Sequence, residues 1–290
     1  MKNYLFVIAS YPDERQQFFE KYMSPRNKEY CLQNNTEYIE VTSKPKLFRD
    51  NPTWWKFTFV KELIESGSVK ENDTVTHIDA DMCIVDPKKP YPIEKNFNYV
   101  IDSGNTHCMG SYSIKVNEWS NQLIENILSE DRYRKLKDEV SYHEHFETYS
   151  SFWKEFREQA SWYSLAGIKR HSNISFFELP NYGWHSDKNE MTYYSLEDLH
   201  KNVQILPANW NVTELIGESS LEFNINKIDH QNVYIRHFSG GQSWRKDWFN
   251  IKGIKFKFFH TKLISNNRYR FKLVFKKFAN LKKRFWKNSI

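Results

Sequence analysis

Two aspartates stand two positions apart inside an apolar run, HIDADMCIVDP, which extends from His77 to Pro87. If this run is a β-strand, its pleat places side chains two residues apart on one face, so Asp79 and Asp81 point the same way. Their charges then repel, and a divalent cation compensates them, since carboxylate oxygens suit Mg²⁺ or Mn²⁺. A capping or turn-forming role for Asp79 is the alternative. The spacing predicts a metal site.

Strand-like and helix-like segments alternate along the chain around this pair. Apolar residues four apart, with Pro52 near the start and Gly67 at the end, predict a helix over 51–67. Such alternation predicts βαβ units and a mostly parallel sheet in an α/β fold. The predicted strands are 4–10, 36–43, 74–85, 97–104, 108–116 and 173–180, and the predicted helical stretches are 11–35, 51–67, 117–136 and 138–159.

The length and composition are those of a globular protein. Its 290 residues, 17% of them aromatic, suffice for one large α/β domain with an appendage. Three cysteines are too few and too scattered for a disulfide framework, which indicates a reducing compartment. The apolar stretch 4–9 is too short for a secretory signal or a membrane span, so we expect a cytoplasmic protein.

Charge divides the chain into two parts. Residues 251–290 contain 13 of the 42 Lys and Arg residues and no acidic residue, so residues 1–250 carry a formal charge of −7. We therefore expect a domain over 1–250 and a basic aromatic tail over 251–290. Such a tail suits an anionic membrane surface, nucleic acid, or packing as a solvated basic helix on an acidic body.

The motifs, taken in order, resemble nucleotide-sugar glycosyltransferases of the GT-A fold, especially the retaining galactosyl- and glucosyltransferase-like families. The resemblance covers about residues 1–250. It implies a Rossmann-like, mostly parallel central sheet flanked by helices, Mn²⁺ (or Mg²⁺) as cofactor, and hexosyl or pentosyl transfer from a UDP-sugar to a glycan or glycolipid. The matching pieces are FVIASY, the WWK helix, HIDADMCIVDP as the DxD motif, DSGNTHCMGSYSIKVNEWS and IRHFSGGQSWRK.

The resemblance also assigns roles to metal ligands. It implies that Asp81 grips the metal, that Asp79 binds the metal or the ribose, and that His237 returns from a late segment as the third ligand. A histidine satisfied inside an edge strand is the alternative for His237. Ser243 stands where the family has a phosphate-contacting lysine, and Arg245 and Lys246 lie just beyond it as candidates for that role.

Further residues are assigned to the donor in the same way. Tyr11 would stack on uracil at the end of the first strand, Ser103 and Asn105 would line the donor sugar, and the WWK helix would bring a basic residue to the nucleotide. The full set of implied nucleotide contacts is Ala9, Ser10, Tyr11, Lys56, Asp79, Ser103, Asn105, Gly240 and Lys246.

A catalytic carboxylate is expected in the segment GWHSDKNEM, where Asp187 is the first choice and Glu190 the second. An inverting enzyme would use it as a general base, and a retaining enzyme would use it to stabilise the oxocarbenium-like state. Capping of a helix N-terminus by Ser186 or Asp187 is the alternative.

Two other functions remain open from the sequence. A phosphotransferase of the haloacid dehalogenase type also uses Asp-x-Asp after a strand, but Met82 and Cys83 follow here where Thr or Gly-Thr is usual. A non-enzymatic nucleic-acid-binding protein would use the tail, yet it leaves the aspartates unexplained, and the acidic body opposes it. The glycosyltransferase interpretation places the tail peripherally on the cytoplasmic face of the membrane, beside lipid-linked acceptors, and predicts no nucleic-acid partner.

Overall fold

The computed structural model describes eight stretches of the chain, and all of them lie in one of the two compact units into which the chain divides. The predicted strand 173–180, most of the predicted helix 138–159 and the tail 251–290 lie outside these stretches, so those elements and the domain boundary at 250 stay predictions. The described residues are 1–9, 16–17, 19–46, 52–101, 107–129, 158–166, 194–213 and 233–237.

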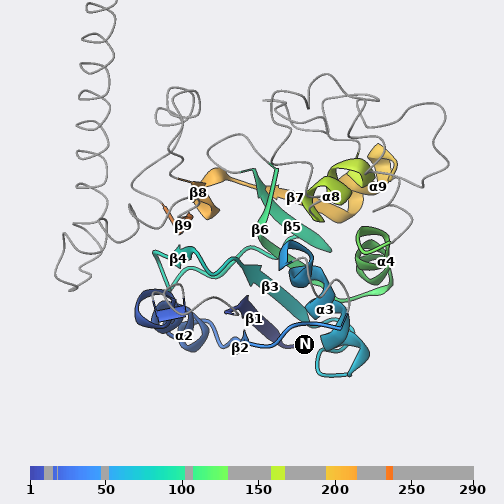
Figure 1. Ribbon diagram of the computed structural model, residues 1–290. Helices are drawn as coiled ribbons and strands as arrows, with labels where there is room; N and C mark the ends of the chain where they lie inside the picture. Colours follow the sequence, from blue (N-terminus) through green and yellow to red (C-terminus); the bar gives the residue numbers. More distant parts are fainter. Residues whose placement is uncertain are drawn as a thin grey trace, which may run out of the picture. The chain divides into compact units, whose positions relative to one another are not determined.

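A six-stranded sheet forms the centre, in the order β2-β1-β3-β6-β5-β7 (Figure 1). β6 is antiparallel to both of its neighbours, while β1, β2, β3, β5 and β7 run in one direction. This confirms the predicted α/β fold with a Rossmann-like, mostly parallel central sheet. The strands are β1 (Asn3–Ile8), β2 (Glu37–Val41), β3 (Thr74–Ile78), β5 (Phe97–Ile101), β6 (His107–Lys115) and β7 (Val203–Leu206).

A smaller sheet adjoins the end of β3. It has the order β4-β9-β8, with β9 antiparallel to β4 and parallel to β8. The prediction of one strand over 74–85 is therefore wrong, because the chain leaves the central sheet after Ile78 and begins a strand of another sheet at Met82. The strands of this sheet are β4 (Met82–Ile84), β8 (Val212–Thr213) and β9 (Ile235–His237).

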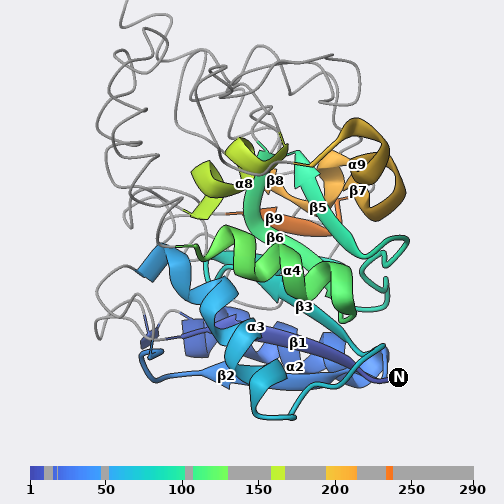
Figure 2. The same ribbon diagram turned by 90° about the vertical axis from the view of Figure 1, so that its right-hand side faces the viewer.

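Helices cover both sides of the central sheet. α3 and α4 lie on one face and α2 lies behind it (Figure 2). α3 ends at Glu65, two residues before Gly67, the residue predicted to mark the helix end. Gly67 has φ +71°, a conformation that glycine adopts without a Cβ clash. The helical elements are η1 (Phe19–Met23), α2 (Ser24–Gln33), η2 (Pro52–Trp54), α3 (Trp55–Glu65), α4 (Glu118–Ile127), α8 (Glu158–Ala166), α9 (Leu196–Asn202) and η4 (Ala208–Trp210).

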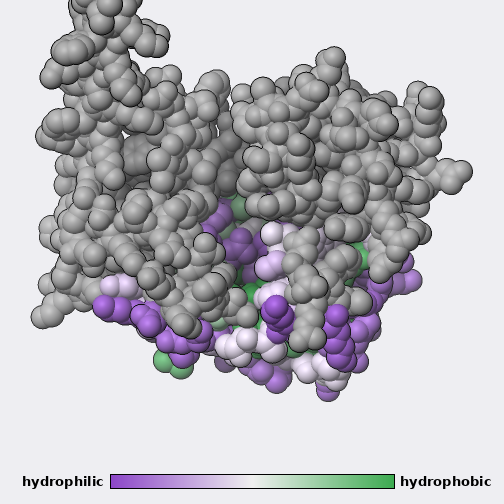
Figure 3. Space-filling model, in the orientation of Figure 1, coloured by the Kyte–Doolittle hydropathy of each residue, from purple (hydrophilic) through white to green (hydrophobic). Residues whose placement is uncertain are grey.

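The hydrophobic core lies between the sheet and α3, α4 and α8. Trp54 and Trp55 are buried in it, together with aromatic residues such as Phe97, Tyr112 and Trp162. At the surface, the described residues visible in Figure 3 are mostly hydrophilic, and apolar ones show only in small areas. Among the described helices, none combines the length and apolar character that a bilayer crossing requires.

Candidate metal and nucleotide site

The two aspartates lie in the turn that joins β3 to β4. The Asp79 N–H donates to the Gly110 carbonyl of β6 at 2.7 Å, and the Met82 N–H closes the turn on the Asp79 carbonyl at 2.9 Å. This turn places both carboxylates beyond the carboxyl end of β3, the edge at which open α/β sheets bind ligands. The pair is therefore juxtaposed by a turn and not by the pleat of one strand.

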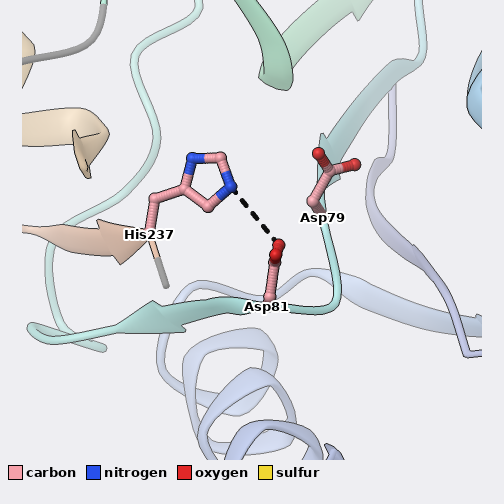
Figure 4. A group of neighbouring side chains, drawn as sticks. All are labelled: Asp79, Asp81 and His237. Carbon is pink, nitrogen blue, oxygen red and sulfur yellow. Dashed lines mark ion pairs between the residues drawn. The ribbon is translucent and has the colours of Figure 1, made fainter. Parts of the chain in front are cut away.

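His237, the last residue of β9, reaches this turn from a part of the chain that is distant in sequence. In the small sheet it pairs with Met82, the residue directly after Asp81. Its Nε2 lies 3.4 Å from Asp81 Oδ1, and ligand atoms of Asp79, Asp81 and His237 all lie within 4.8 Å of one another (Figure 4). The structure thus brings together the three residues that the sequence resemblance implied as metal ligands.

This donor set suits a divalent cation. Two carboxylates match the oxygen preference of Mg²⁺ and Mn²⁺, and an imidazole extends the choice toward transition metals, so Mn²⁺ satisfies both kinds of donor. Burial by itself lowers the pKa of His237, but the neighbouring Asp81 carboxylate raises it well above its usual value. In the absence of a metal, a proton on His237 therefore offsets part of the negative charge.

The Asp79 carboxylate contacts two basic side chains. Lys56 Nζ lies 3.1 Å from Asp79 Oδ1, and His77 Nε2 lies 3.0 Å from the same oxygen. Burial alone raises the pKa of Asp79, yet these two partners hold it well below its usual range. The carboxylate is consequently ionised and held by these contacts, while 30% of the side chain stays exposed.

Lys56 joins this carboxylate to a third one. Its ammonium lies 2.9 Å from Glu158 Oε1 at the start of α8 and donates to the Met109 carbonyl at 3.3 Å. Burial lowers the pKa of Lys56, but Asp79 and Glu158 raise it above its ordinary value, so it stays charged. The described part of the site therefore contains three carboxylates, of Asp79, Asp81 and Glu158, and one ammonium. When His237 is neutral, one divalent cation balances the negative charge that remains.

Some of the predicted site residues lie in the described stretches of the chain, and the others lie outside them. Ala9 is buried at the carboxyl end of β1, next to β3, and its N–H donates to the Val41 carbonyl at 2.7 Å. Lys56 forms ion pairs with Asp79 and Glu158, so it supports one of the candidate metal ligands. The predicted residues outside the described stretches are Ser10, Tyr11, Ser103, Asn105, Asp187, Glu190, Gly240 and Lys246.

Four residues of the site were not predicted from the sequence: His77, Gly110, Glu158 and Asn211. An isolated glycine inside a strand marks a close approach, so Gly110 in CMGSYSI carried a usable signal. Glu158 and Asn211 carried none, because each stands in a segment without a recognisable motif. Asn211 Oδ1 lies 3.1 Å from His237 Nδ1.

Gly110 provides the space that the Asp79 carboxylate occupies. A Cβ at this position would lie 2.6 Å from Asp79 Oδ2 and 2.7 Å from Met82 Cε. We expect Gly110→Ala to displace Asp79 and to weaken Mn²⁺ binding by about 10- to 100-fold, since small misplacements of site groups have large effects. Calorimetric titration with Mn²⁺ measures this. Ser113→Ala, farther along β6, is the control. Equal Mn²⁺ affinities in the wild type, Gly110→Ala and Ser113→Ala would contradict the prediction.

Comparisons with known proteins find likeness in structure but not in sequence. No protein-family model matches the chain, and no curated protein matches it. It is similar to the solved structure of a glycosyltransferase involved in glycosylation of the major capsid of PBCV-1, with a TM-score of 0.49 and 10% identity over 86% of this chain and 100% of that one.

Two further similar structures are galactosyltransferases. The galactosyltransferase LgtC, solved with donor and acceptor sugar analogs, has a TM-score of 0.35 and 10% identity over 82% of this chain and 87% of that one. The catalytic domain of Drosophila beta1,4-galactosyltransferase 7, in complex with xylobiose, has a TM-score of 0.31 and 9% identity over 44% of this chain and 52% of that one. At these identities the function has to be argued from the site.

Proposed function

We propose that the protein is a metal-dependent glycosyltransferase that moves a hexosyl or pentosyl group from a nucleotide-sugar donor to a glycan or glycolipid acceptor. UDP-sugar is the proposed donor and Mn²⁺, or Mg²⁺, the proposed metal. The observation that carries the proposal is the cluster of Asp79, Asp81 and His237 beyond the carboxyl end of β3. Ala9 follows the last residue of β1, the parallel neighbour of β3, at the same edge of the sheet, where a nucleotide can approach both strands.

The chemistry of sugar transfer explains why such a cluster is needed. As the glycosidic bond breaks, negative charge develops on the departing nucleoside diphosphate. A divalent cation supplies Lewis-acid stabilisation of that charge when it is bound. Asp81 and His237 would hold it, and Asp79 would contribute an oxygen to the metal or to the ribose. Lys56 and His77 keep the Asp79 carboxylate ionised and oriented for that role.

The reacting sugar and the acceptor need further groups. We assign the carboxylate near the anomeric carbon to Asp187, with Glu190 as the second choice, and the donor contacts to Ser10, Tyr11, Ser103, Asn105, Gly240 and Lys246. These assignments rest on the sequence motifs. The basic tail over 251–290 is proposed to hold the protein on an anionic membrane surface near a lipid-linked acceptor, and this too rests on sequence.

A donor-hydrolysis screen tests the proposal. The full chain is incubated with UDP-, GDP- and other nucleotide sugars, with Mn²⁺ or with a chelator, and released sugar is measured. We expect hydrolysis of a UDP-sugar that falls by at least about 100-fold on metal removal, the loss expected when the charge stabiliser of a leaving group is taken away.

Two outcomes would contradict this function. Absence of any metal-dependent nucleotide-sugar binding would remove its basis. Hydrolysis of p-nitrophenyl phosphate in place of nucleotide sugars would instead favour the phosphotransferase alternative, because that reaction needs a phosphomonoester site and no sugar.

A further inference from the structure

The two ring nitrogens of His237 have different partners. Nε2 faces Asp81 Oδ1 at 3.4 Å, whereas Nδ1 lies 3.1 Å from Asn211 Oδ1, and Figure 4 shows the two nitrogens on different sides of the ring. An amide oxygen can only accept a hydrogen bond, so Nδ1 must carry a hydrogen and donate it. When His237 is neutral, the lone pair is then on Nε2, the atom that faces the two aspartates.

Asn211 is held rigidly enough to impose this choice. Its side chain is fully buried, and its N–H donates to the Ala208 carbonyl at 2.9 Å, which closes η4. The next residue, Val212, begins β8, which runs parallel to β9 and pairs Thr213 with His237. The backbone that carries the amide and the backbone that carries the imidazole are therefore linked in one small sheet.

The packing around this segment restricts it further. Trp210 contacts the rings of Tyr91 and Tyr234, with centroids 5.2 and 4.5 Å apart, and the Tyr234 N–H donates to the Asn209 carbonyl at 2.9 Å. These contacts hold the segment that carries Asn211 in place, and in the structure its Oδ1 is the atom that meets His237 Nδ1.

We propose that Asn211 is a positioning residue for the metal site: its side-chain oxygen fixes the Nδ1–H form of His237 and so directs Nε2 at the cation. This inference rests on the proposed function, because it takes His237 as a metal ligand. It adds to the three proposed metal ligands a buried side chain, Asn211, that orients one of them, His237. Partners of this kind typically contribute 10- to 100-fold in metal affinity.

The test uses the full chain and Mn²⁺ alone. Electron spin-echo spectroscopy of bound Mn²⁺ detects the nitrogen of a directly coordinated imidazole, and calorimetry gives the affinity. We expect Asn211→Leu to lose the nitrogen signal and to weaken Mn²⁺ binding by about 10- to 100-fold. Asn211→Asp keeps an accepting oxygen, so it should retain the signal and stay within about threefold of wild-type affinity or bind more tightly.

A matched control separates positioning from packing. Asn202 is also buried, but its amide bonds to Asp198 and Asn96, away from the cluster. Asn202→Leu should lose stability without losing the nitrogen signal or Mn²⁺ affinity. If Asn211→Leu does not fold, Asn211→Ala takes its place, because it also removes the acceptor and fits the same space.

The outcomes distinguish this inference from the proposed function. A wild-type protein that does not bind Mn²⁺ overturns both. A wild-type protein that binds Mn²⁺ without a nitrogen signal overturns His237 as a ligand and the role of Asn211 with it. A nitrogen signal and affinity that persist unchanged in Asn211→Leu overturn the inference about Asn211 alone and leave the function standing.

Discussion

Replacement of Asp81 by alanine is expected to abolish Mn²⁺-dependent UDP binding, with a loss of at least about 100-fold, or about 2.7 kcal/mol. Two effects combine. The substitution removes one carboxylate donor of the cluster, and it takes away the ion-pair partner of His237 Nε2. Asp79 cannot replace it, because Asp79 is already one of the three possible donors and Lys56 and His77 hold its carboxylate in place.

Calorimetry with UDP, in the presence and absence of Mn²⁺, measures this loss. Asp86→Ala is the control, since Asp86 lies just beyond β4 and its carboxylate accepts from the Lys88 N–H outside the cluster. We expect that variant to bind as the wild type does. Wild-type affinity in Asp81→Ala would show that the cluster is not the metal site.

Removal of the Lys56 ammonium is expected to have the largest effect on stability. In Lys56→Met the carboxylates of Asp79 and Glu158 remain in place without the cation that lies between them. Loss of one partner from a buried charge cluster typically costs about 3–5 kcal/mol. Urea denaturation should show a decrease of this size in the free energy of unfolding, and the double variant Lys56→Met/Glu158→Gln should recover part of it.

Lys61 provides the comparison on the same helix. It is more exposed than Lys56 and pairs with Glu65 and Glu125, which are both largely solvent-accessible. Lys61→Met should therefore cost no more than about 1 kcal/mol, as is usual for surface ion pairs. If Lys56→Met were no less stable than Lys61→Met, the buried cluster would not have the energetic role assigned to it.

Much of the central sheet could be predicted from the sequence because its signals are local. β2 and β5 lie within predicted strands, and β1 and β6 each begin one residue before the predicted start. The pattern of α3, with Pro52 before it and Gly67 after it, matches the observed helix. The segment 74–85 was misjudged because apolar residues flank the Asp-Ala-Asp turn on both sides, with no glycine or proline to mark it. Periodicity cannot distinguish one strand from two that belong to different sheets.

The sequence alone determined the chemical character of the site: two carboxylates at the end of an apolar run, and a late histidine that the resemblance pointed to. Only the tertiary structure decided which groups support them. The contacts of Lys56 with Glu158 and of Asn211 with His237 join segments far apart in the chain. Such contacts depend on sheet register and helix packing, which are set by the burial of whole elements and leave no periodic trace at the residues that meet.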